Sequence, residues 1–191
     1  GTEPFRVVNE TITYVSDDGT EERSVPVRLT RHGPVISDSV EELRGEGDVV
    51  LAMRWAGLDS ATYDLAAMRR IMVARDWESF RSALRGLAFV VQNWSYADAS
   101  GTIAFINGGA VPKRREGHDG TMPVPGWTSR LEWNGYIPWD ELPQLVNPAC
   151  GYIVTANNAP FPPGECPYEF SHYYCFPYRA RRVTQMLLER L

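Results

Sequence analysis

The spacing of apolar residues changes along the chain from the period of a strand to that of a helix and back, so no all-α or all-β fold accommodates it. Apolar and polar side chains alternate over residues 5–14, and the alternation resumes at Val25. The intervening residues Asp17, Asp18 and Gly19 are turn formers. Alternation on both sides of such residues is typical of a β-hairpin. The sequence therefore predicts an antiparallel hairpin over its first thirty residues or so.

Helical spacing follows in three places. One predicted helix runs from Tyr63 to Val73, the next is capped by Asp76, and the last begins near Pro177 or Tyr178. The inner faces are expected to hold Leu65, Met68, Ile71 and Met72 in the first helix, Trp77, Phe80, Leu84 and Leu87 in the second, and Val183, Met186 and Leu187 in the third.

The remaining strand signals surround these helices. Residues 88–97 and 102–107 flank the turn sequence 98–101, which predicts a second hairpin. Residues 49–55 and 151–156 read as further strands. Between the second hairpin and residues 151–156, proline, glycine and tryptophan are frequent, which favours ordered loops with short strands because proline restricts the backbone. The predicted class is α+β with mainly antiparallel sheet.

The composition of the chain argues against a nucleic-acid or membrane partner. Of the 191 residues 43% are hydrophobic and 23% are charged, as in ordinary globular proteins. The net charge is −5 and no basic stripe is present, which argues against a nucleic-acid partner. No apolar run is long enough to cross a bilayer, so no membrane span is expected.

The cysteines and histidines give no metal or redox signature. Cys150, Cys166 and Cys175 contain no Cys-x-x-Cys pair, and a zinc site is not favoured. One disulfide between Cys166 and Cys175 and three reduced thiols are both consistent with the spacing. The histidines are far apart in the sequence and are expected to be structural: His32, His118 and His172.

Short motifs carry more information than any self-contained catalytic set. The chain has no Gly-rich phosphate loop, no His-Glu-x-x-His and no Gly-x-Ser-x-Gly. The informative stretches are residues 31–35, 92–98, 117–120, 123–127, 133–138, 147–148, 151–158 and 178–183.

Taken in order, from about residue 10 to residue 191, these stretches resemble the penicillin acylase (penicillin amidase) family of N-terminal nucleophile hydrolases. The family includes acylases for penicillins, cephalosporins and acyl-homoserine lactones. The resemblance implies part of an αββα architecture and a two-step amide hydrolysis. In the family a serine freed by self-cleavage attacks the amide, its own α-amine acts as the base, and water releases the acid from an acyl-enzyme.

The resemblance begins inside the larger (beta) subunit of the family, downstream of its N-terminal nucleophile. Residues 1–191 are therefore expected to be a single internal fragment that is inactive alone. Gly1 has no side chain to attack with, and Thr2 lies away from the position of the family's nucleophile. The fragment is expected to expose apolar surface, and so to bind the remaining segments of its precursor or to form a homodimer.

Two other functions compete with this interpretation. A non-enzymatic binding module would use exposed aromatic residues as a ligand platform, with Trp127, Trp133 and Trp139 as candidates. A structural scaffold would shape a larger assembly without binding a small molecule at all.

The resemblance assigns two catalytic residues. Asn157 matches the family's oxyanion-hole asparagine, with Asn158 as the alternative if the register is off by one. Arg182 matches the family's arginine near the nucleophile and the asparagine, where a guanidinium orients the amide by hydrogen bonds and favours the neutral amine. Arg179 and Arg181 are its competitors.

The resemblance also suggests a substrate pocket and a location. Gln92 and Met68 match positions near the family's acyl pocket, although Met68 equally fits a helix core. The family's calcium site uses carboxylates upstream of this chain and a carbonyl near Gly120. Because calcium takes six to eight oxygens, no metal and no other cofactor is expected, and Asp119 is expected to be a turn residue. Family members suggest a periplasmic or secreted protein.

Overall fold

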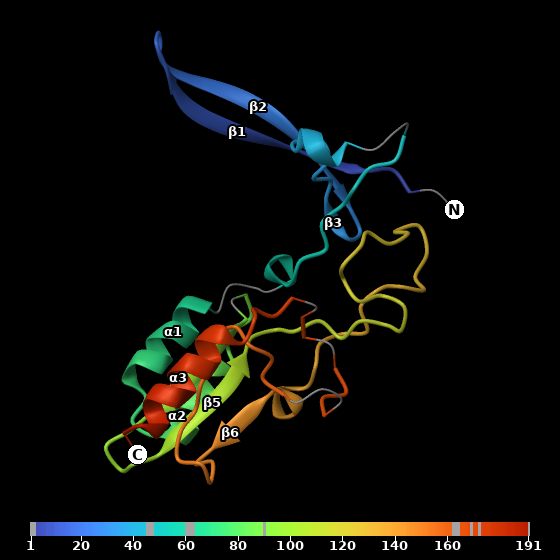
Figure 1. The fold of residues 1–191 in the computed structure, drawn as a ribbon. Helices are drawn as coiled ribbons and strands as arrows, with labels where there is room; N and C mark the ends of the chain where they lie inside the picture. Colours follow the sequence, from blue (N-terminus) through green and yellow to red (C-terminus); the bar gives the residue numbers. More distant parts are fainter. Residues whose placement is uncertain are drawn as a thin grey trace.

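The computed structural model describes residues 3–44, 48–59, 64–89, 91–161, 165–168, 170–171 and 173–190. In this part of the chain it is α+β, with two three-stranded antiparallel sheets and three α-helices. Figure 1 shows a long arm that projects from a body, and the body holds the second sheet and all three helices. No helix among the described residues is both long and apolar enough to span a bilayer.

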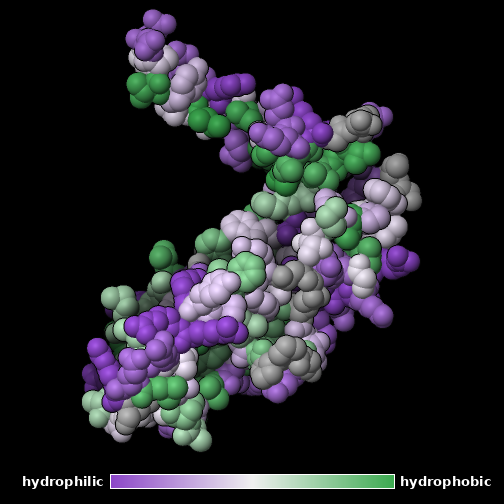
Figure 2. All heavy atoms as spheres, viewed as in Figure 1, coloured by the Kyte–Doolittle hydropathy of each residue, from purple (hydrophilic) through white to green (hydrophobic). Residues whose placement is uncertain are grey.

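The arm is the predicted first hairpin. Strands β1 (Arg6–Ser16) and β2 (Gly19–Thr30) pair along their whole length, and β3 (Gly33–Pro34) adds two residues to β2. Both faces of the hairpin are largely exposed, and Val15 at its tip is 84% exposed. Figure 2 shows apolar residues along the arm and at its base.

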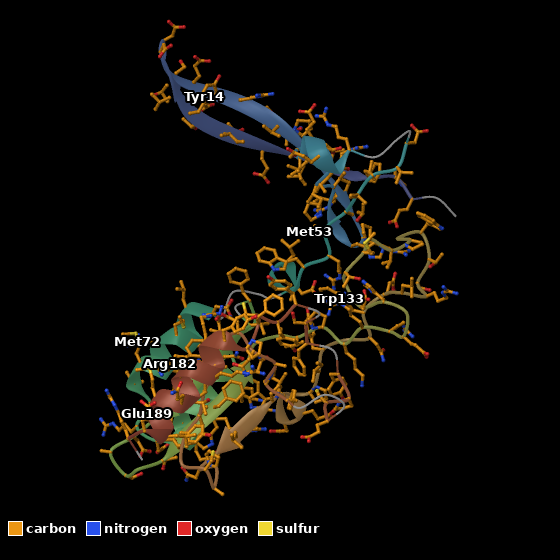
Figure 3. All side chains as sticks on the ribbon, in the orientation of Figure 1. Tyr14, Met53, Met72, Trp133, Arg182 and Glu189 are labelled. Atoms are coloured by element: carbon orange, nitrogen blue, oxygen red, sulfur yellow. The ribbon has the colours of Figure 1, made fainter. Side chains whose placement is uncertain are left out.

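The predicted strand over residues 49–55 is wrong. The structure has only an isolated bridge there, from Val35 to Ala52. Val35 directly follows β3, which is only two residues long, so the bridge does not extend into a ladder of paired strand residues. The two segments approach very closely at this point, since a Cβ on Gly33 would lie 2.2 Å from the carbonyl oxygen of Met53. Figure 3 labels Met53 at this junction between arm and body.

Helices α1 (Asp64–Val73) and α2 (Trp77–Leu84) confirm the helical spacing. The side chain of Asp76 accepts a hydrogen bond from the backbone N–H of Ser79 at 2.7 Å, and the Ser79 hydroxyl accepts from the N–H of Asp76 at 3.2 Å. This reciprocal capping box satisfies backbone donors that the helix leaves free. Tyr63, the predicted first residue of α1, lies outside the described residues.

The second sheet is the platform of the body. Strand β4 (Gln92–Ala97) pairs with β5 (Ile103–Gly108), which pairs with β6 (Gln144–Val146). The predicted second hairpin is thus confirmed, with a later start. In its turn, hydrogen bonds led by the Ser100 hydroxyl lower the pKa of the Asp98 carboxyl to about 2.

Helix α2 packs on one face of this sheet. Trp77 and Leu84 form a buried cluster with Ala104 and Ile106 of β5. The predicted inner face of α2 is therefore correct. That of α1 is largely wrong, because α1 meets its neighbours through buried Ala67 and through Ile71. The other residues predicted to face inward are exposed: Leu65 85%, Met68 45% and Met72 85%.

Residues 110–148 are mostly loop with one short strand, β6, as predicted. This segment contains a second buried cluster of Val111, Ile137 and Leu142.

Short 3-10 helices occur along the described chain, at Glu41–Leu43, Ala56–Leu58 and Trp139–Glu141.

Two further predictions concern the end of the chain. Helix α3 (Tyr178–Leu188) follows Pro177 as expected, but no residue of it is buried, including the three on its predicted inner face. The predicted strand over residues 151–156 is absent, because this segment pairs with no strand and is held through side chains instead.

Candidate active site

The segment before α3 borders a hollow of about 390 Å³. The hollow lies where residues 155–157 of this segment meet the start of β4, the end of β5 and the first turn of α3. It brings together Asn157 and Gln92, two of the four residues singled out in the sequence. The lining residues are Val91, Gln92, Asn93, Asn107, Thr155, Ala156, Asn157 and Arg179.

Asn157 sits in a backbone conformation that few residues adopt. Its φ is 60°, in the left-handed region that asparagine tolerates better than most side chains. The backbone carbonyl of Asn157 accepts a hydrogen bond from the N–H of Cys175 at 2.8 Å. This bond ties the turn to the segment that leads into α3, so the surrounding chain holds the left-handed conformation in place.

The side-chain amide of Asn157 is oriented by Arg179. A guanidinium N–H of Arg179 donates to Oδ1 of Asn157 at 2.7 Å. Because a guanidinium carries only donors, the oxygen of the amide must face it. The two N–H groups of Asn157 are therefore turned away from Arg179, and a donor fixed in this way is what a developing oxyanion requires.

The neighbouring Asn158 has a different role. Its Oδ1 accepts from the backbone N–H of Ala156 at 3.0 Å, and its Nδ2 donates to the carbonyl of Ala159 at 3.0 Å. Both ends of this amide thus hold the turn together. The structure favours Asn157 over Asn158 as the residue with a donor to offer.

A different arginine lies beside Asn157 than the resemblance suggests. Among the described residues that line the hollow, Arg179 is present and Arg182 is not. Arg182 lies further along α3 (Figure 3). Arg181 borders a separate shallow hollow on the same helix. The catalytic role of Arg182 stays a prediction, whereas the contact that the resemblance attributes to it is made by Arg179.

Of the two residues predicted to bind substrate, Gln92 lines the hollow and Met68 does not. Gln92 is exposed at the start of β4 and lines the hollow. Met68 is exposed on α1 and is not among the described residues that line it. Neither position is buried in a core, so the alternative of core packing for Met68 is not supported.

Three polar lining residues, Asn93, Asn107 and Thr155, were not named individually as site residues in the sequence, although two of them lie in the informative stretches 92–98 and 151–158. Asn107 donates from Nδ2 to Oδ1 of Asn93 at 3.0 Å, and Asn93 donates from Nδ2 to Oγ1 of Thr155 at 3.3 Å. Asn93 and Asn107 are opposite each other in the β4–β5 register. A polar pair at the open end of a predicted hairpin was the signal that could have found them.

Among the described histidines and cysteines, none lines this hollow. His118 contacts the carbonyl of Leu131 at 2.8 Å and His32 that of Gly126 at 2.9 Å, so both serve structure as expected. His172 lies outside the described residues. The three cysteines are free thiols, which answers the open question about a disulfide.

The three tryptophans of the alternative binding module differ in exposure, and only Trp127 is exposed. Trp127 is 79% exposed, whereas Trp139 packs against both buried clusters. Trp133 is stacked under the guanidinium of Arg54, whose carbon lies 4.6 Å from the ring centroid. A common aromatic platform is therefore not formed.

The residues present do not fit a calcium ion by themselves. No group of three His, Cys, Asp or Glu side chains that could hold a metal occurs in the described part of the chain. Asp119 accepts hydrogen bonds from the N–H and hydroxyl of Thr121, as a turn residue does.

Comparison with known proteins decides the family. The sequence model of the penicillin amidase family matches residues 1–191. The chain belongs to this family. It is 36% identical over 139 residues to the penicillin G acylase of Escherichia coli, a match that covers 71% of this chain and 16% of that protein.

Other members of the penicillin amidase family match more of the chain. The penicillin acylase 2 proenzyme of Pseudomonas sp. (strain SE83) is 31% identical, over 89% of this chain and 21% of its own length. An acyl-homoserine lactone acylase, QuiP, of Pseudomonas fluorescens (strain Pf-5) is 32% identical, over 95% of this chain and 22% of its own. The chain thus spans about a fifth of the length of these relatives.

The fold agrees with the family. A thermostable penicillin G acylase from Alcaligenes faecalis superposes with a TM-score of 0.78 at 24% sequence identity. The match covers 97% of this chain and 32% of that one. This likeness confirms the predicted α+β fold.

Proposed function

We propose that this chain is a portion of an amide hydrolase that removes acyl groups from amides through an acyl-enzyme. Relatives named as penicillin acylases and as acyl-homoserine lactone acylases support this activity. The proposed substrates are linear acyl amides of penicillin-like, cephalosporin-like or homoserine lactone type, and the names of these relatives support the first and the last of these types. In this proposal the attacking group comes from a part of the protein outside residues 1–191.

One observation carries the proposal. The guanidinium of Arg179 holds Oδ1 of Asn157 at 2.7 Å beside the hollow, so the N–H groups of this amide are preorganised as donors. When a nucleophile adds to the substrate carbonyl, negative charge develops on its oxygen. An amide N–H stabilises that charge without titrating, and a fixed donor needs no reorganisation during the reaction.

The two arginines provide a matched test of this geometry. In the full-length enzyme, Arg179→Met should lower kcat by about 10- to 100-fold, since a hydrogen bond to a charged group contributes roughly 1.5–3 kcal/mol. Arg182→Met removes the same group from the same helix and should have the smaller effect. Turnover of one acyl amide by both variants, with folding checked by circular dichroism, shows which arginine contributes more to kcat. A larger loss at Arg182 would place the catalytic contact at Arg182 and contradict our assignment.

We further propose that the exposed apolar side chains of α1 and α3 bind other segments of the precursor. Leu65 and Met72 on α1 and Leu188 on α3 are 85%, 85% and 59% exposed, and large exposed apolar patches mark sites that bind other proteins. The isolated chain should therefore bind a hydrophobic dye strongly and form dimers in light scattering. A strict monomer with little dye fluorescence would contradict this expectation.

A further inference from the structure

A hydrogen-bonded chain of three polar side chains leads from the second sheet to the segment that carries Asn157. Asn107 on β5 donates to Asn93 on β4 at 3.0 Å, and Asn93 donates to the hydroxyl oxygen of Thr155 at 3.3 Å. Asn107 is partly buried, whereas Thr155 is exposed at the hollow, two residues before Asn157. The bonds thus run from the sheet toward the hollow and end at a hydroxyl.

The direction of these bonds follows from what is buried. Oδ1 of Asn107 is buried and has no hydrogen-bond partner among the described residues. If both amides were turned over, the buried atom without a partner would be a nitrogen with two N–H groups instead of one oxygen. Unpartnered buried N–H groups are rarer than under-satisfied carbonyl oxygens. The arrangement in which Asn93 donates to Thr155 is therefore favoured.

This direction determines what Thr155 can offer. Its oxygen accepts from Asn93, so its hydrogen is available to a ligand, and a hydroxyl that already accepts a bond is a stronger donor. The described residues that line the hollow include no carboxylate, while Asn157 and Arg179 are donors there. The hollow therefore suits oxygen atoms that accept hydrogen bonds.

We infer that Thr155 is a substrate-binding residue, whose hydroxyl donates to an acceptor oxygen of the bound amide and is directed there by Asn107 and Asn93. The inference rests on the proposed function, because it takes the hollow to be the substrate site. Thr155 binds the substrate in the ground state and in the transition state alike. Its loss should accordingly raise KM and leave kcat largely unchanged.

The first test replaces the hydroxyl. In the full-length enzyme, with a neutral acyl anilide as substrate, Thr155→Val should raise KM about five- to tenfold, the value of one ordinary hydrogen bond. Thr155→Ser keeps the hydroxyl and should restore a KM close to that of the unmodified enzyme. A KM unchanged in Thr155→Val, or raised equally in Thr155→Ser, would overturn the inference.

The second test reverses the hydrogen bond. In Asn93→Asp the carboxylate can only accept, so it can still accept from Asn107 but now also accepts the Thr155 hydrogen, which turns away from the hollow. KM should rise as in Thr155→Val. When Asn93→Asp and Thr155→Val are combined in one double variant, their effects on KM should not add, because both changes remove the same hydrogen-bond donor. Additive effects would instead indicate a separate effect of charge or folding and would overturn the inference.

The same assays separate this inference from the proposed function. If Asn157→Ala abolishes turnover but Thr155→Val leaves KM unchanged, only the role of Thr155 is wrong. If Asn157→Ala leaves turnover intact, the hollow is not the catalytic site and both proposals fail.

Discussion

Asn157→Ala in the full-length enzyme is expected to lower kcat by about 10²- to 10³-fold, the usual consequence of losing one oxyanion donor. The side chain is exposed at the hollow, so its removal leaves no cavity in a core. The main effect should therefore be on the rate of the chemical step, with a loss of stability of about 1–2 kcal/mol because alanine tolerates the left-handed φ of 60° less well than asparagine. Steady-state kinetics with a chromogenic acyl amide, together with a thermal melt, measure both.

Two further variants make this result specific. Asn157→Asp keeps an acceptor for Arg179 but has no N–H to donate, so it should be at least as inactive as the alanine variant. Asn9→Ala removes another exposed asparagine, on the arm, and should leave kcat unchanged. Substantial activity in Asn157→Asp would show that the N–H groups are not needed, which contradicts the assignment.

Leu84→Ala is expected to destabilise the chain by about 2–5 kcal/mol, the range for truncating a buried leucine. Leu84 is 0% exposed at the centre of the cluster that joins α2 to the sheet. Truncation removes buried apolar area and leaves a cavity that its neighbours fill only in part. Urea unfolding followed by tryptophan fluorescence measures the change.

Leu65→Ala is the matched control. It makes the same substitution on α1, at a leucine that is 85% exposed in the single chain. At a protein concentration too low for dimers to form, it should change the stability of the isolated chain by less than about 0.5 kcal/mol. Equal losses at the two positions under these conditions would mean that the side chain of Leu65 is buried within the single chain, which contradicts its exposure in the structure.

The local elements were predictable where short-range chemistry determines them. The Asp98 turn, the Asp76 cap and the alternation over residues 5–14 each specify their element without help from the rest of the chain. The strands predicted at 49–55 and 151–156 failed because a strand needs a partner of matching length, and the sequence does not state which partner is present.

The candidate site was predictable only in part. Asn157 and Gln92 were assigned by resemblance, and the structure places both at one hollow. The contact of Arg179 with Asn157 could not be derived, because three arginines follow one another within a helical turn and only the position of α3 decides between them. Likewise, the sequence of α1 shows an apolar face, but it does not show which residues of the helix pack against the rest of this chain and which stay exposed.

The most direct test of the catalytic assignment is a crystal structure of the full-length enzyme with a bound boronate or phosphonate analogue of the tetrahedral intermediate. The account predicts Nδ2 of Asn157 at about 2.7–3.1 Å from the oxyanion oxygen of the analogue, the distance of a working oxyanion-hole donor, with Oδ1 still bound by Arg179. An analogue seated elsewhere, or an Asn157 side chain turned away from its oxyanion, would contradict it.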